Sequence, residues 1–493
     1  MPGEEELIQL RREKLARIQQ RADAFPARVN RTHDTAAALA AFEAWEAAGS
    51  QGEAPTVSAA GRITALRDMG KASFLDLRDG SGRIQCYVKK DIIGEDAYAA
   101  LADLDLGDFL SVAGPLFRTR TQEITVEARE YQVLAKALRP PPEKWHGIAD
   151  VEIRYRQRYL DLMANEDVRD LFRTRAAVVA AMRRYLDGRG FMEVETPVLQ
   201  LEAGGAAATP FVTHHRALDQ DFFLRISLEL HLKRLIIGGY DRVYEIGRIF
   251  RNEGVSWKYN PEFTMLECYE AYADYNDVAR MVEDMVSGLA SQVLGTTTVE
   301  FEGHTIDLTS PWKRVTMREA LIEHAGIDFQ EFRTREMLYE ELRRRAFADL
   351  DPGWSWGKLI DEAVSHYVEP KLIQPTFLLD YPKEISPLAK SKPGEDGIVE
   401  RFEFFIAGFE MGNAYSELND PVDQRERFET QRRLAAAGLE EVETLDEDFL
   451  TALEYGMPPT GGLGIGIDRL TMILTGQRSI REVILFPAMR RKE

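Results

Sequence analysis

Apolar and polar positions alternate through residues 242–273 in a pattern that predicts two strands joined by a loop. Successive side chains of a strand point to opposite faces. In the second strand, residues 264–273, one face should carry Met265, Glu267, Tyr269 and Ala271, and the other Leu266 and Cys268. The first strand, residues 242–250, ends directly before Arg251, and the loop that follows carries Asn252, Glu253, Lys258, Asn260 and Phe263. This unit offers a planar cation, acids, a phenol and an aromatic ring. Taken alone, it also fits a half-exposed hairpin with solvated charges.

Residues 4–25 repeat apolar side chains at helical spacing among several arginines, which predicts an amphipathic helix with a basic side. That side could contact phosphates or face water. Between residues 55 and 137 the pattern changes to five short runs rich in β-formers, separated by glycine-containing turns. Such a series is typical of a small five-stranded barrel of the oligonucleotide-binding kind. On it, Phe74 would suit base stacking, with Arg67 and Gln85 reading base edges, unless Phe74 belongs to the barrel core.

The run LRPPP at residues 138–142 breaks regular structure and is the best candidate for a linker. A long helix is predicted over residues 167–189, ended by Gly190, and a strand over residues 191–197. The next strand pattern sets Glu229 before an apolar helix. We expect a helical extension at residues 1–50, the barrel at 51–142, and a larger domain at 143–493 with a helical insertion near 322–364.

Two acids in the C-terminal third of the chain lie where one cation could reach both. The aromatic run at residues 402–406 favours a strand, and Gly408 can turn or bulge the chain before a second strand. Glu403 and Glu410 would face opposite sides of a straight strand, so a shared role requires that turn. With it they suggest Mg²⁺, held by carboxylates and by nucleotide phosphates; otherwise they are surface acids. The second strand would carry on one face Asn413, Tyr415 and Glu417.

The stretch at residues 461–476 is rich in glycine but matches neither common nucleotide-binding loop. Ile467 stands where the dinucleotide fingerprint needs a third glycine, and the chain has no Walker-type phosphate loop. Arg469 falls in the first turn of a helix opened by Asp468, where a cation opposes the helix dipole at a cost of about 0.3–1 kcal/mol. Phosphate oxygens or a neighbouring carboxylate would offset that cost.

Composition narrows the class of protein. Of the 493 residues, 44% are hydrophobic and 29% charged, which fits a globular protein rather than a disordered or membrane chain. No apolar run approaches the roughly 20 residues that span a bilayer, and the start lacks a secretory signal, so we expect a cytoplasmic protein with no membrane partner. A net charge of -20 argues against general nucleic-acid binding. Cys86 and Cys268 should be buried strand cysteines, and adjacent His214 and His215 disfavour a metal because they would face opposite ways.

Three stretches together resemble the signature motifs of class II aminoacyl-tRNA synthetases. They are FMEVETP ending in Pro197, FRNEG followed by NPEFTMLE within residues 250–267, and GLGIGIDRL at residues 462–470. More narrowly, GRITALRDMGKASFLDLRD, RYRQRYLDL, GNAYSELND and IREVILFPAMRR resemble the lysyl-tRNA synthetases of this class. The resemblance implies an α+β fold, with an anticodon-binding barrel followed by a catalytic domain whose antiparallel six-stranded sheet is flanked by helices. It also implies a homodimer built partly on the segment around Pro197.

The resemblance further implies how the chain would bind ATP, L-lysine and tRNA(Lys), with Mg²⁺ as the metal. Around ATP it places Arg251, Glu253, Asn260, Phe263, Glu403 and Arg469, with Arg251 on the α-phosphate and the lysine carboxylate, and Phe263 and Arg469 on either side of adenine. Around lysine it places Gly205, Glu229 and Glu267 at the α-amino group, Asn413 at the carboxylate, and Tyr269 and Glu417 at the ε-ammonium. Mg²⁺ falls to Glu403 and Glu410, and the U-rich anticodon to Arg67, Phe74 and Gln85.

The implied reaction needs no side chain as a nucleophile. The lysine carboxylate attacks the α-phosphorus, pyrophosphate leaves, and a 3′-terminal hydroxyl of tRNA then takes the lysyl group. Positioning and charge stabilisation by Arg251, Arg469 and Mg²⁺ should dominate. Selectivity should rest on Glu417, because a buried carboxylate without an ammonium partner is costly. The family usually has a basic or histidine-bearing stretch where this chain has Trp257-Lys258-Tyr259, so a cationic contact there falls to Lys258.

Other functions share part of this pattern. An aspartyl or asparaginyl relative would keep the barrel and the ATP site, but Glu229, Glu267 and Glu417 would repel aspartate. A non-catalytic tRNA-binding relative would be expected to have lost Arg251, Arg469 or the pair of acids. A lysine ligase acting on a protein would be expected to lack the barrel.

Overall fold

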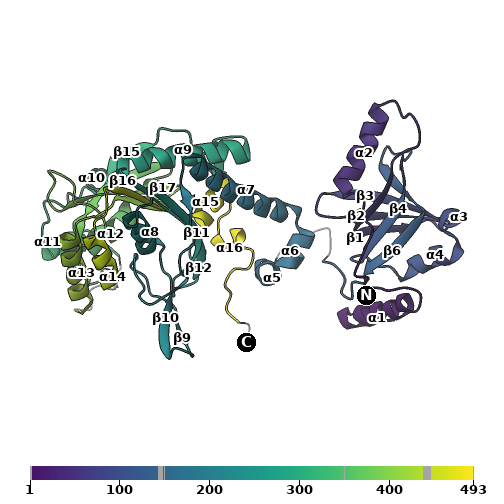
Figure 1. Cartoon of the computed structure of the whole chain (residues 1–493), viewed down its shortest axis with the longest axis horizontal. Coiled ribbons are helices and arrows are strands. Elements are labelled where there is room, and N and C mark those ends of the chain that lie inside the picture. Colours follow the sequence, from purple (N-terminus) through teal and green to yellow (C-terminus); the bar gives the residue numbers. More distant parts are fainter. Residues whose placement is uncertain (1–2, 143–147, 149, 349, 437–445, 492–493) are drawn as a thin grey trace. The chain divides into compact units, whose positions relative to one another are not determined.

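The chain folds into two units, Met1–Ala149 and Asp150–Glu493, in this computed structural model (Figure 1). The structure describes residues 3–142, 148, 150–348, 350–436 and 446–491. Each unit encloses hydrophobic clusters of its own. Among the helices of these described residues, none is long and apolar enough to cross a membrane.

Five strands of the first unit close into a barrel, as predicted. They are β1 (Thr56–Asp68), β2 (Ala72–Arg78), β3 (Arg83–Lys89), β4 (Phe109–Arg118) and β5 (Ile124–Ala128). They pair in the order β1-β2-β3-β5-β4, and β4 also pairs with β1. The last β-rich run is divided at Arg129, after which β6 (Glu130–Ala135) pairs with β4. Alternate side chains such as Val57, Ala59 and Leu75 fill the interior together with the buried Cys86.

Helices α1 (Glu4–Gln19) and α2 (Thr35–Ala47) precede the barrel, and the short α3 (Lys90–Ile93) and α4 (Glu95–Ala99) join β3 to β4. The helix predicted over residues 4–25 is α1, and it ends earlier than predicted, at Gln19. Its basic side contacts polar groups of the same unit rather than only water. These contacts join Arg17 to Asp103 (2.7 Å), Lys14 to Asp105 (2.7 Å) and Arg11 to the carbonyl of Ala137 (2.9 Å).

The second unit is built on an eight-stranded sheet. Its strands are β7 (Met192–Glu193), β11 (Arg242–Phe250), β12 (Glu262–Ala271), β15 (Lys313–Thr316), β16 (Thr376–Pro382), β17 (Ile398–Ile406), β18 (Phe409–Ser416) and β19 (Thr460–Gly466). Their order is β15-β16-β17-β18-β19-β12-β11-β7. The six central strands are antiparallel, as expected. Each of the short outer strands is parallel to its neighbour, β15 to β16 and β7 to β11.

Helices pack on both faces of this sheet, and one face also carries a cavity. The long α7 (Glu166–Gly188), α9 (Tyr275–Leu294) and α15 (Ile467–Thr475) supply the main hydrophobic cluster, which includes Leu266 and Cys268 of β12. A second cluster joins α10 (Met317–Ala325), α11 (Arg335–Arg344) and α12 (Trp356–Tyr367) to β16 and β17. These three helices contain most of the predicted helical segment near residues 322–364.

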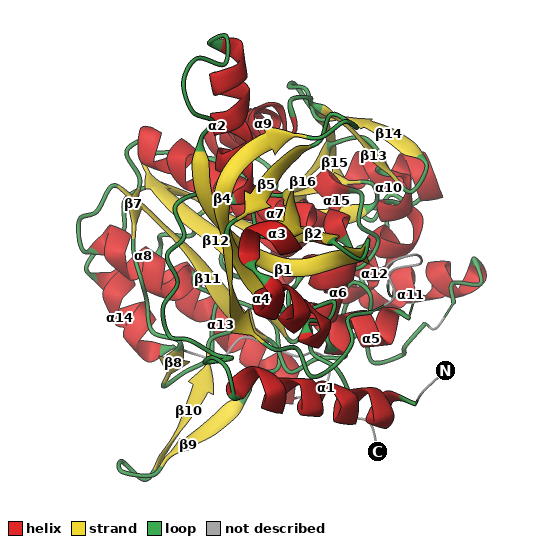
Figure 2. Ribbon diagram, turned by 90° about the vertical axis from the view of Figure 1, so that its right-hand side faces the viewer, coloured by secondary structure: helices red, strands yellow, loops and turns green. Residues whose placement is uncertain are grey.

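The remaining elements of the second unit border the sheet. The helices are α5 (Val151–Arg156), α6 (Arg158–Ala164), α8 (Glu229–Ile237), α13 (Pro421–Ala436), α14 (Glu447–Glu454) and α16 (Ile480–Val483). The strands are β8 (Leu199–Gln200), β9 (Val212–His215), β10 (Gln220–Leu224), β13 (Thr298–Phe301) and β14 (His304–Asp307). β9 and β10 form a hairpin that projects away from the sheet of this unit (Figure 2).

Several boundaries differ from the sequence prediction for local reasons. The helix predicted at residues 167–189 is α7, and Gly190 after it has a φ of 80°, which favours glycine. In the strand predicted at residues 191–197, only Met192–Glu193 are assigned as strand, pairing with β11. The strand β10 stops at Leu224, and four residues separate it from the start of α8 at Glu229.

A tight turn brings the two C-terminal acids to one face. Ala407 and Gly408, with φ angles of 54° and 76°, join β17 to β18, so Ile406 pairs with Phe409 and Phe405 with Glu410. Met411 is then an extra residue, because Phe404 pairs with Gly412. Residues paired across two strands share a face, so the turn places Glu410 on the face of Glu403. The bulge at Met411 returns Asn413 to that same face.

Candidate active site

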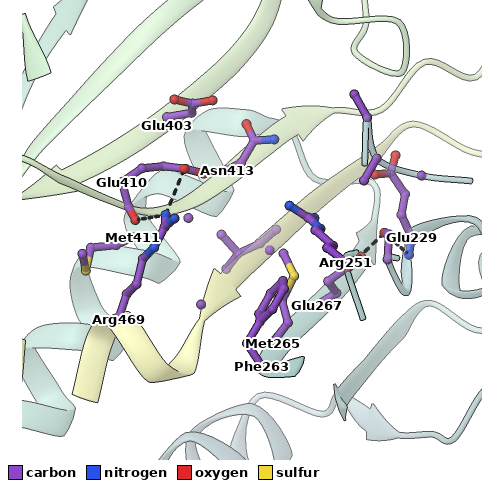
Figure 3. Close-up of a pocket in the computed structure, with 18 of the residues that line it drawn as sticks. Glu229, Arg251, Phe263, Met265, Glu267, Glu403, Glu410, Met411, Asn413 and Arg469 are labelled. Atoms are coloured by element: carbon purple, nitrogen blue, oxygen red, sulfur yellow. Dashed lines mark hydrogen bonds and ion pairs between the residues drawn. The ribbon is translucent and has the colours of Figure 1, made fainter. Parts of the chain in front are cut away.

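A cavity of about 700 Å³ opens on the face of the large sheet that carries Glu267 and Tyr269. It contains every candidate residue predicted for this unit: Gly205, Glu229, Arg251, Glu253, Asn260, Phe263, Glu267, Tyr269, Glu403, Glu410, Asn413, Glu417 and Arg469. Figure 3 shows Arg469 and Glu410 at one end, Arg251 and Phe263 between, and Glu229 at the other end. The cavity thus brings together residues that are far apart in the sequence.

The strand β12 gives the cavity its central wall. Met265, Glu267 and Tyr269 line the cavity, and Leu266 and Cys268 between them enter the hydrophobic core, as the alternation predicted. Phe263 belongs to this strand and not to the preceding loop, because pairing with β11 already begins at Glu262. The prediction that the strand starts at residue 264 was therefore wrong by two residues.

Arg251 follows β11 and reaches into the middle of the cavity. Its Nε donates to the carbonyl of Ile226 at 3.3 Å, and its guanidinium carbon lies 5.4 Å from the centre of the Phe263 ring. Its backbone N–H is bonded to the carbonyl of Pro261, which holds the loop between the two strands closed at its base. A guanidinium held in this way can bind a phosphate or carboxylate without prior rearrangement.

At the end of the cavity away from Glu229, α15 positions Arg469. The preceding Asp468 accepts a hydrogen bond from the N–H of Thr264 at 2.7 Å and lies 2.6 Å from Arg175 Nη1. Arg469 Nη1 donates to the carbonyl of Glu410 at 2.8 Å and to its Oε2 at 3.0 Å. Burial opposes the charge, but the Glu410 carboxylate raises the pKa of Arg469 above its usual value. The carboxylate partner considered from the sequence is therefore present.

Glu403 and Glu410 both line the cavity, but neither is isolated (Figure 3). Burial raises the pKa of Glu403, the neighbouring Arg401 lowers it, and the Glu410 charge raises it further. Among the described residues, no three or more His, Cys, Asp or Glu side chains gather as a ready metal site. Two carboxylates that face one cavity fit an ion that takes its other ligands from phosphate and water.

Arg401 is a site residue that the sequence interpretation missed. It is two positions before Glu403 on β17, and the signal was the alternation that puts both on one face. Its Nη2 lies 2.6 Å from Glu403 Oε1, and its Nε donates to Asn413 Oδ1 at 3.0 Å. The guanidinium also lies 4.5 Å from the centre of the Tyr381 ring. Arg401 therefore joins the acid proposed for the metal to the amide proposed for the lysine carboxylate.

The end of the cavity near Glu229 is acidic and buried. Glu267 accepts hydrogen bonds from Ser227 Oγ at 3.1 Å and from the N–H of Leu228 at 2.9 Å, and the Tyr269 hydroxyl donates to it at 3.1 Å. Burial raises the pKa of Glu267 to about 7, and the Glu229 charge contributes. Burial also raises the pKa of Glu417, which is 2% exposed. Carboxylates placed this deep favour a cationic guest.

The floor beneath Glu417 is made of glycine. A Cβ at Gly462 would lie 1.9 Å from Glu417 Oε1 and 2.6 Å from Tyr269 Cε1. A Cβ at Gly464 would lie 2.7 Å from Met265 Cε. The sequence showed a glycine-rich stretch but gave no register, so it did not reveal that these glycines make room for the site's side chains. Gly205, whose φ is 84°, leaves comparable room beside Ser227, where a Cβ would lie 2.9 Å from Oγ.

The loop Trp257-Lys258-Tyr259 lies over the end of the cavity near Arg469. The Lys258 ammonium is 5.1 Å from the centre of the Trp257 ring and 5.2 Å from that of Phe409, and the Arg469 guanidinium is 5.6 Å from that of Tyr259. Lys258 and Tyr259 both line the cavity. Lys258 is thus placed to supply the positive charge that Tyr259 lacks.

The remaining candidates, Arg67, Phe74 and Gln85, lie on the strands β1, β2 and β3 of the barrel. Phe74 lies outside the barrel's buried hydrophobic cluster, 5.0 Å from the Tyr87 ring centre, and Tyr87 lies 6.0 Å from Phe117. Arg67 Nη2 is 3.3 Å from Asp76 Oδ1. Gln85 is buried and donates to Glu123 Oε2 at 3.1 Å. The strand pairing therefore surrounds three aromatic rings with polar side chains, an arrangement suited to stacked bases.

A barrel of this kind and an antiparallel sheet that carries two arginines and several acids in one cavity are the arrangement that the resemblance to class II aminoacyl-tRNA synthetases implied. The chain belongs to the class II tRNA synthetases of the D, K and N type, whose family model matches residues 150–490. Residues 57–134 match the model of the OB-fold nucleic acid binding domain.

Relatives within this family make the assignment narrower. The chain is 55% identical to a lysine–tRNA ligase of Dehalococcoides mccartyi strain 195, over 99% of this chain and 98% of that protein. It is 53% identical to a lysine–tRNA ligase of Moorella thermoacetica, over 100% of this chain and 99% of that protein. It is 50% identical to a lysine–tRNA ligase of Bacillus subtilis strain 168, over 98% of this chain and 97% of that protein.

Proposed function

We propose that this chain is a lysine–tRNA ligase, which uses ATP to activate L-lysine as lysyl-adenylate and then transfers lysine to the 3′ end of tRNA(Lys). The observation that carries the proposal is the buried acidic end of the cavity. Glu417 Oε1 accepts no hydrogen bond from the described residues, although it is buried. A buried carboxylate oxygen without a partner is costly, and the ε-ammonium of lysine would supply one.

We propose that ATP occupies the end of the cavity between Arg251 and Arg469. Arg251 would bind the α-phosphate together with the lysine carboxylate. Phe263 and Arg469 would lie on either side of the adenine, and Glu253 and Asn260 would help to place the nucleotide. The 5.4 Å contact between Arg251 and Phe263 supports this arrangement, because it sets a cation beside an aromatic surface suited to a base.

Mg²⁺ is the metal that the donor set fits. Glu403 and Glu410 would hold it, and hard carboxylate oxygens with phosphate are its usual ligands. When bound, the ion would neutralise charge on the phosphates. Arg401 would keep the Glu403 carboxylate facing the cavity through the 2.6 Å contact.

Lysine would lie along β12 with its charges matched at both ends. Gly205, Glu229 and Glu267 would surround the α-amino group, and Asn413 would support the carboxylate. Tyr269 and Glu417 would receive the ε-ammonium. With lysine held so, its carboxylate can attack the α-phosphorus as pyrophosphate leaves, and Arg251 stabilises the charge that spreads over the phosphate oxygens. No side chain needs to act as a nucleophile.

The barrel surface would bind the anticodon of tRNA(Lys). Phe74 would stack on a base, and Arg67 and Gln85 would contact base edges. The Phe74–Tyr87–Phe117 cluster supports this role, since aromatic rings on the outside of a barrel gain little from folding alone.

We also propose a homodimer that acts in the cytoplasm, where its tRNA substrate is. The segment around Pro197 supports the dimer because it exposes Met192, Val198, Leu199 and Leu201 (40–57% exposed). Grouped apolar side chains of this kind usually mark an interface.

The test is ATP–pyrophosphate exchange with purified protein, Mg²⁺ and each standard amino acid in turn. We expect exchange with lysine alone. Exchange with aspartate or asparagine instead would overturn the lysine assignment and keep the family. Absence of exchange with every amino acid would favour a non-catalytic tRNA-binding relative.

A further inference from the structure

A buried lysine of the chain itself lies behind the acidic end of the cavity, in contact with two of the acids that line it. Lys233 is 0% exposed and lies one helical turn after Glu229 on α8. Its Nζ lies 2.5 Å from Glu229 Oε1 and also contacts Glu417 Oε2. The third neighbour of the ammonium is the ring of Phe449, whose centre is 5.9 Å away. Lys233 therefore bridges two carboxylates that the proposed function assigns to opposite ends of the substrate.

The charge of Lys233 is needed in this environment. Glu229, Glu267 and Glu417 lie together, and each is at most 5% exposed. Like charges in a buried site strongly disfavour ionisation of one another. One fixed ammonium between two of them offsets part of that repulsion before any substrate arrives.

The contact is also one-sided, and this determines what Glu417 offers to a ligand. The closest contact of the Lys233 ammonium with Glu417 is to Oε2, and neither Oε1 nor Oε2 accepts a hydrogen bond from the described residues. Oε1 lies where a Cβ at Gly462 would be only 1.9 Å away, so it faces the space that this glycine leaves open. Tyr269 borders the same space, since the same Cβ would be 2.6 Å from its Cε1.

We infer that Lys233 is a positioning residue for lysine specificity: its ammonium holds Oε2 of Glu417 and leaves Oε1 turned toward the ε-ammonium of the substrate. The inference rests on the proposed function. Lys233 itself does not contact the reacting atoms. It acts through Glu417, and through Glu229 it links the sites proposed for the two amino groups of lysine.

The groups that face Glu417 determine how the site responds to pH. They are Lys233 and Glu229 from α8, and Glu267 and Tyr269 from β12; α14 contributes the uncharged Phe449, and β19 contributes Gly462. Of these, Lys233 is the only cation, and it lowers the pKa of Glu417, whereas burial and the other carboxylates raise it. Removal of Lys233 therefore raises that pKa. Because lysine binding needs ionised Glu417, the acid limb of kcat/KM for lysine must then move to higher pH.

The first test variant is Lys233→Met, assayed by lysine-dependent ATP–pyrophosphate exchange from pH 6 to 9. We expect the KM for lysine to rise by about tenfold or more, the KM for ATP to change by less than about twofold, and the acid limb to shift upward. Lys233→Arg keeps the charge in a different geometry, so it should show a smaller rise in KM with the acid limb unmoved. A lysine KM and acid limb like those of the unaltered protein in Lys233→Met would overturn the inference.

The matched control is Lys136→Met in the barrel. Lys136 is also a buried ammonium between two carboxylates, 2.5 Å from Asp105 Oδ2 and 2.8 Å from Asp108 Oδ2. Its loss should lower thermal stability without changing the KM for lysine. An equal rise in lysine KM in this control would show a general folding effect and sink the inference.

Two further outcomes are decisive. If Lys233→Met does not fold, Lys233→Gln takes its place as the charge-free variant, and an unchanged lysine KM and acid limb in that variant would show that the position of Glu417 does not depend on the ammonium. The unaltered protein separates this inference from the proposed function. If it shows no exchange with lysine, the function is wrong; if it does and Lys233→Met behaves identically, only the role of Lys233 is wrong.

Discussion

Glu417 follows directly after β18 and combines deep burial with carboxylate oxygens that accept no hydrogen bond from the described residues. Its backbone N–H is bonded to the carbonyl of Thr460, so the residue is held between two strands. The backbone is therefore fixed at this residue, and what the side chain contributes to binding a cation comes from its charge. A neutral residue of the same shape isolates this contribution.

Glu417→Gln should weaken lysine binding while leaving the ATP site intact. Disrupting a buried charge pair costs about 3–5 kcal/mol, which corresponds to a rise in lysine KM on the order of a hundredfold or more. The KM for ATP should remain nearly unchanged, because Glu417 lies at the opposite end of the cavity from Arg469. Steady-state exchange kinetics at varied lysine and ATP measure both constants.

Glu283→Gln serves as the control for that change. Glu283 is a buried carboxylate of α9 that accepts hydrogen bonds from Trp312 and Arg314, away from the cavity. Its variant should retain the lysine KM of the unaltered protein. Unchanged lysine kinetics in Glu417→Gln would remove Glu417 from the proposed role.

The charged residues that belong to the motifs could be recognised as site candidates from the sequence, and the structure brings them into one cavity. Lys233 could not, because it acts through a partner that only tertiary structure supplies; for Arg401, strand alternation indicated the shared face with Glu403 but not the contact with Asn413. Lys233 is four residues after Glu229, a spacing that on any helix suggests an ordinary surface ion pair. Its approach to Glu417 depends on how α8 packs beside β12 and β18.

At the scale of elements, strand periodicity was the most informative signal. It placed Glu267 and Tyr269 on one face of β12 without any knowledge of the neighbouring strands. Boundaries were less accurate: the strand predicted at residues 191–197 is assigned only at Met192–Glu193. That strand is short because its pairing with β11 covers only Met192 and Glu193, and the extent of this pairing cannot be read from the local sequence.

The helix α9 allows a prediction about stability that is independent of the active site. Gly288 lies exposed in its interior, and a Cβ there would have no heavy atom within 4 Å. Gly288→Ala should therefore raise the free energy of unfolding by about 0.5–1 kcal/mol, because alanine loses less backbone entropy in a helix. Chemical denaturation of the purified protein measures the change.

Gly295, at the end of the same helix, provides the opposite case. Its φ is 74°, a conformation that costs about 1–2 kcal/mol for residues with a Cβ. Gly295→Ala should thus destabilise the protein. If both substitutions lower stability, the prediction for Gly288 is wrong, and another surface packs against α9 at that position in solution.

At the scale of the whole molecule, the two units differ in what they contain. The hydrophobic cluster of the barrel draws only on residues between Ala38 and Val133, and the cavity draws only on residues from Gly205 onward. Units with separate cores usually fold separately. Adenylate formation and anticodon binding should then be separable.

The fragment Asp150–Glu493 should retain lysine-dependent exchange within about fivefold of the full chain, because its core and cavity are intact. Its rate of tRNA charging should fall by at least about tenfold, since each lost base–aromatic stack costs about 1–3 kcal/mol. Exchange and charging assays on the same preparation test both. Loss of exchange in a folded fragment would contradict the prediction.

The bulge at Met411 has a consequence for how this region can change over time. Glu410 and Asn413 are three positions apart, an odd spacing that a regular strand would send to opposite faces, and Met411 is the extra residue that keeps them on one face. Loss of Met411 alone would reduce the spacing to two, so Glu410 and Asn413 would still share a face and the ladder would become regular. A one-codon deletion could therefore remove the bulge without separating the acid proposed for the metal from the amino-acid end of the cavity.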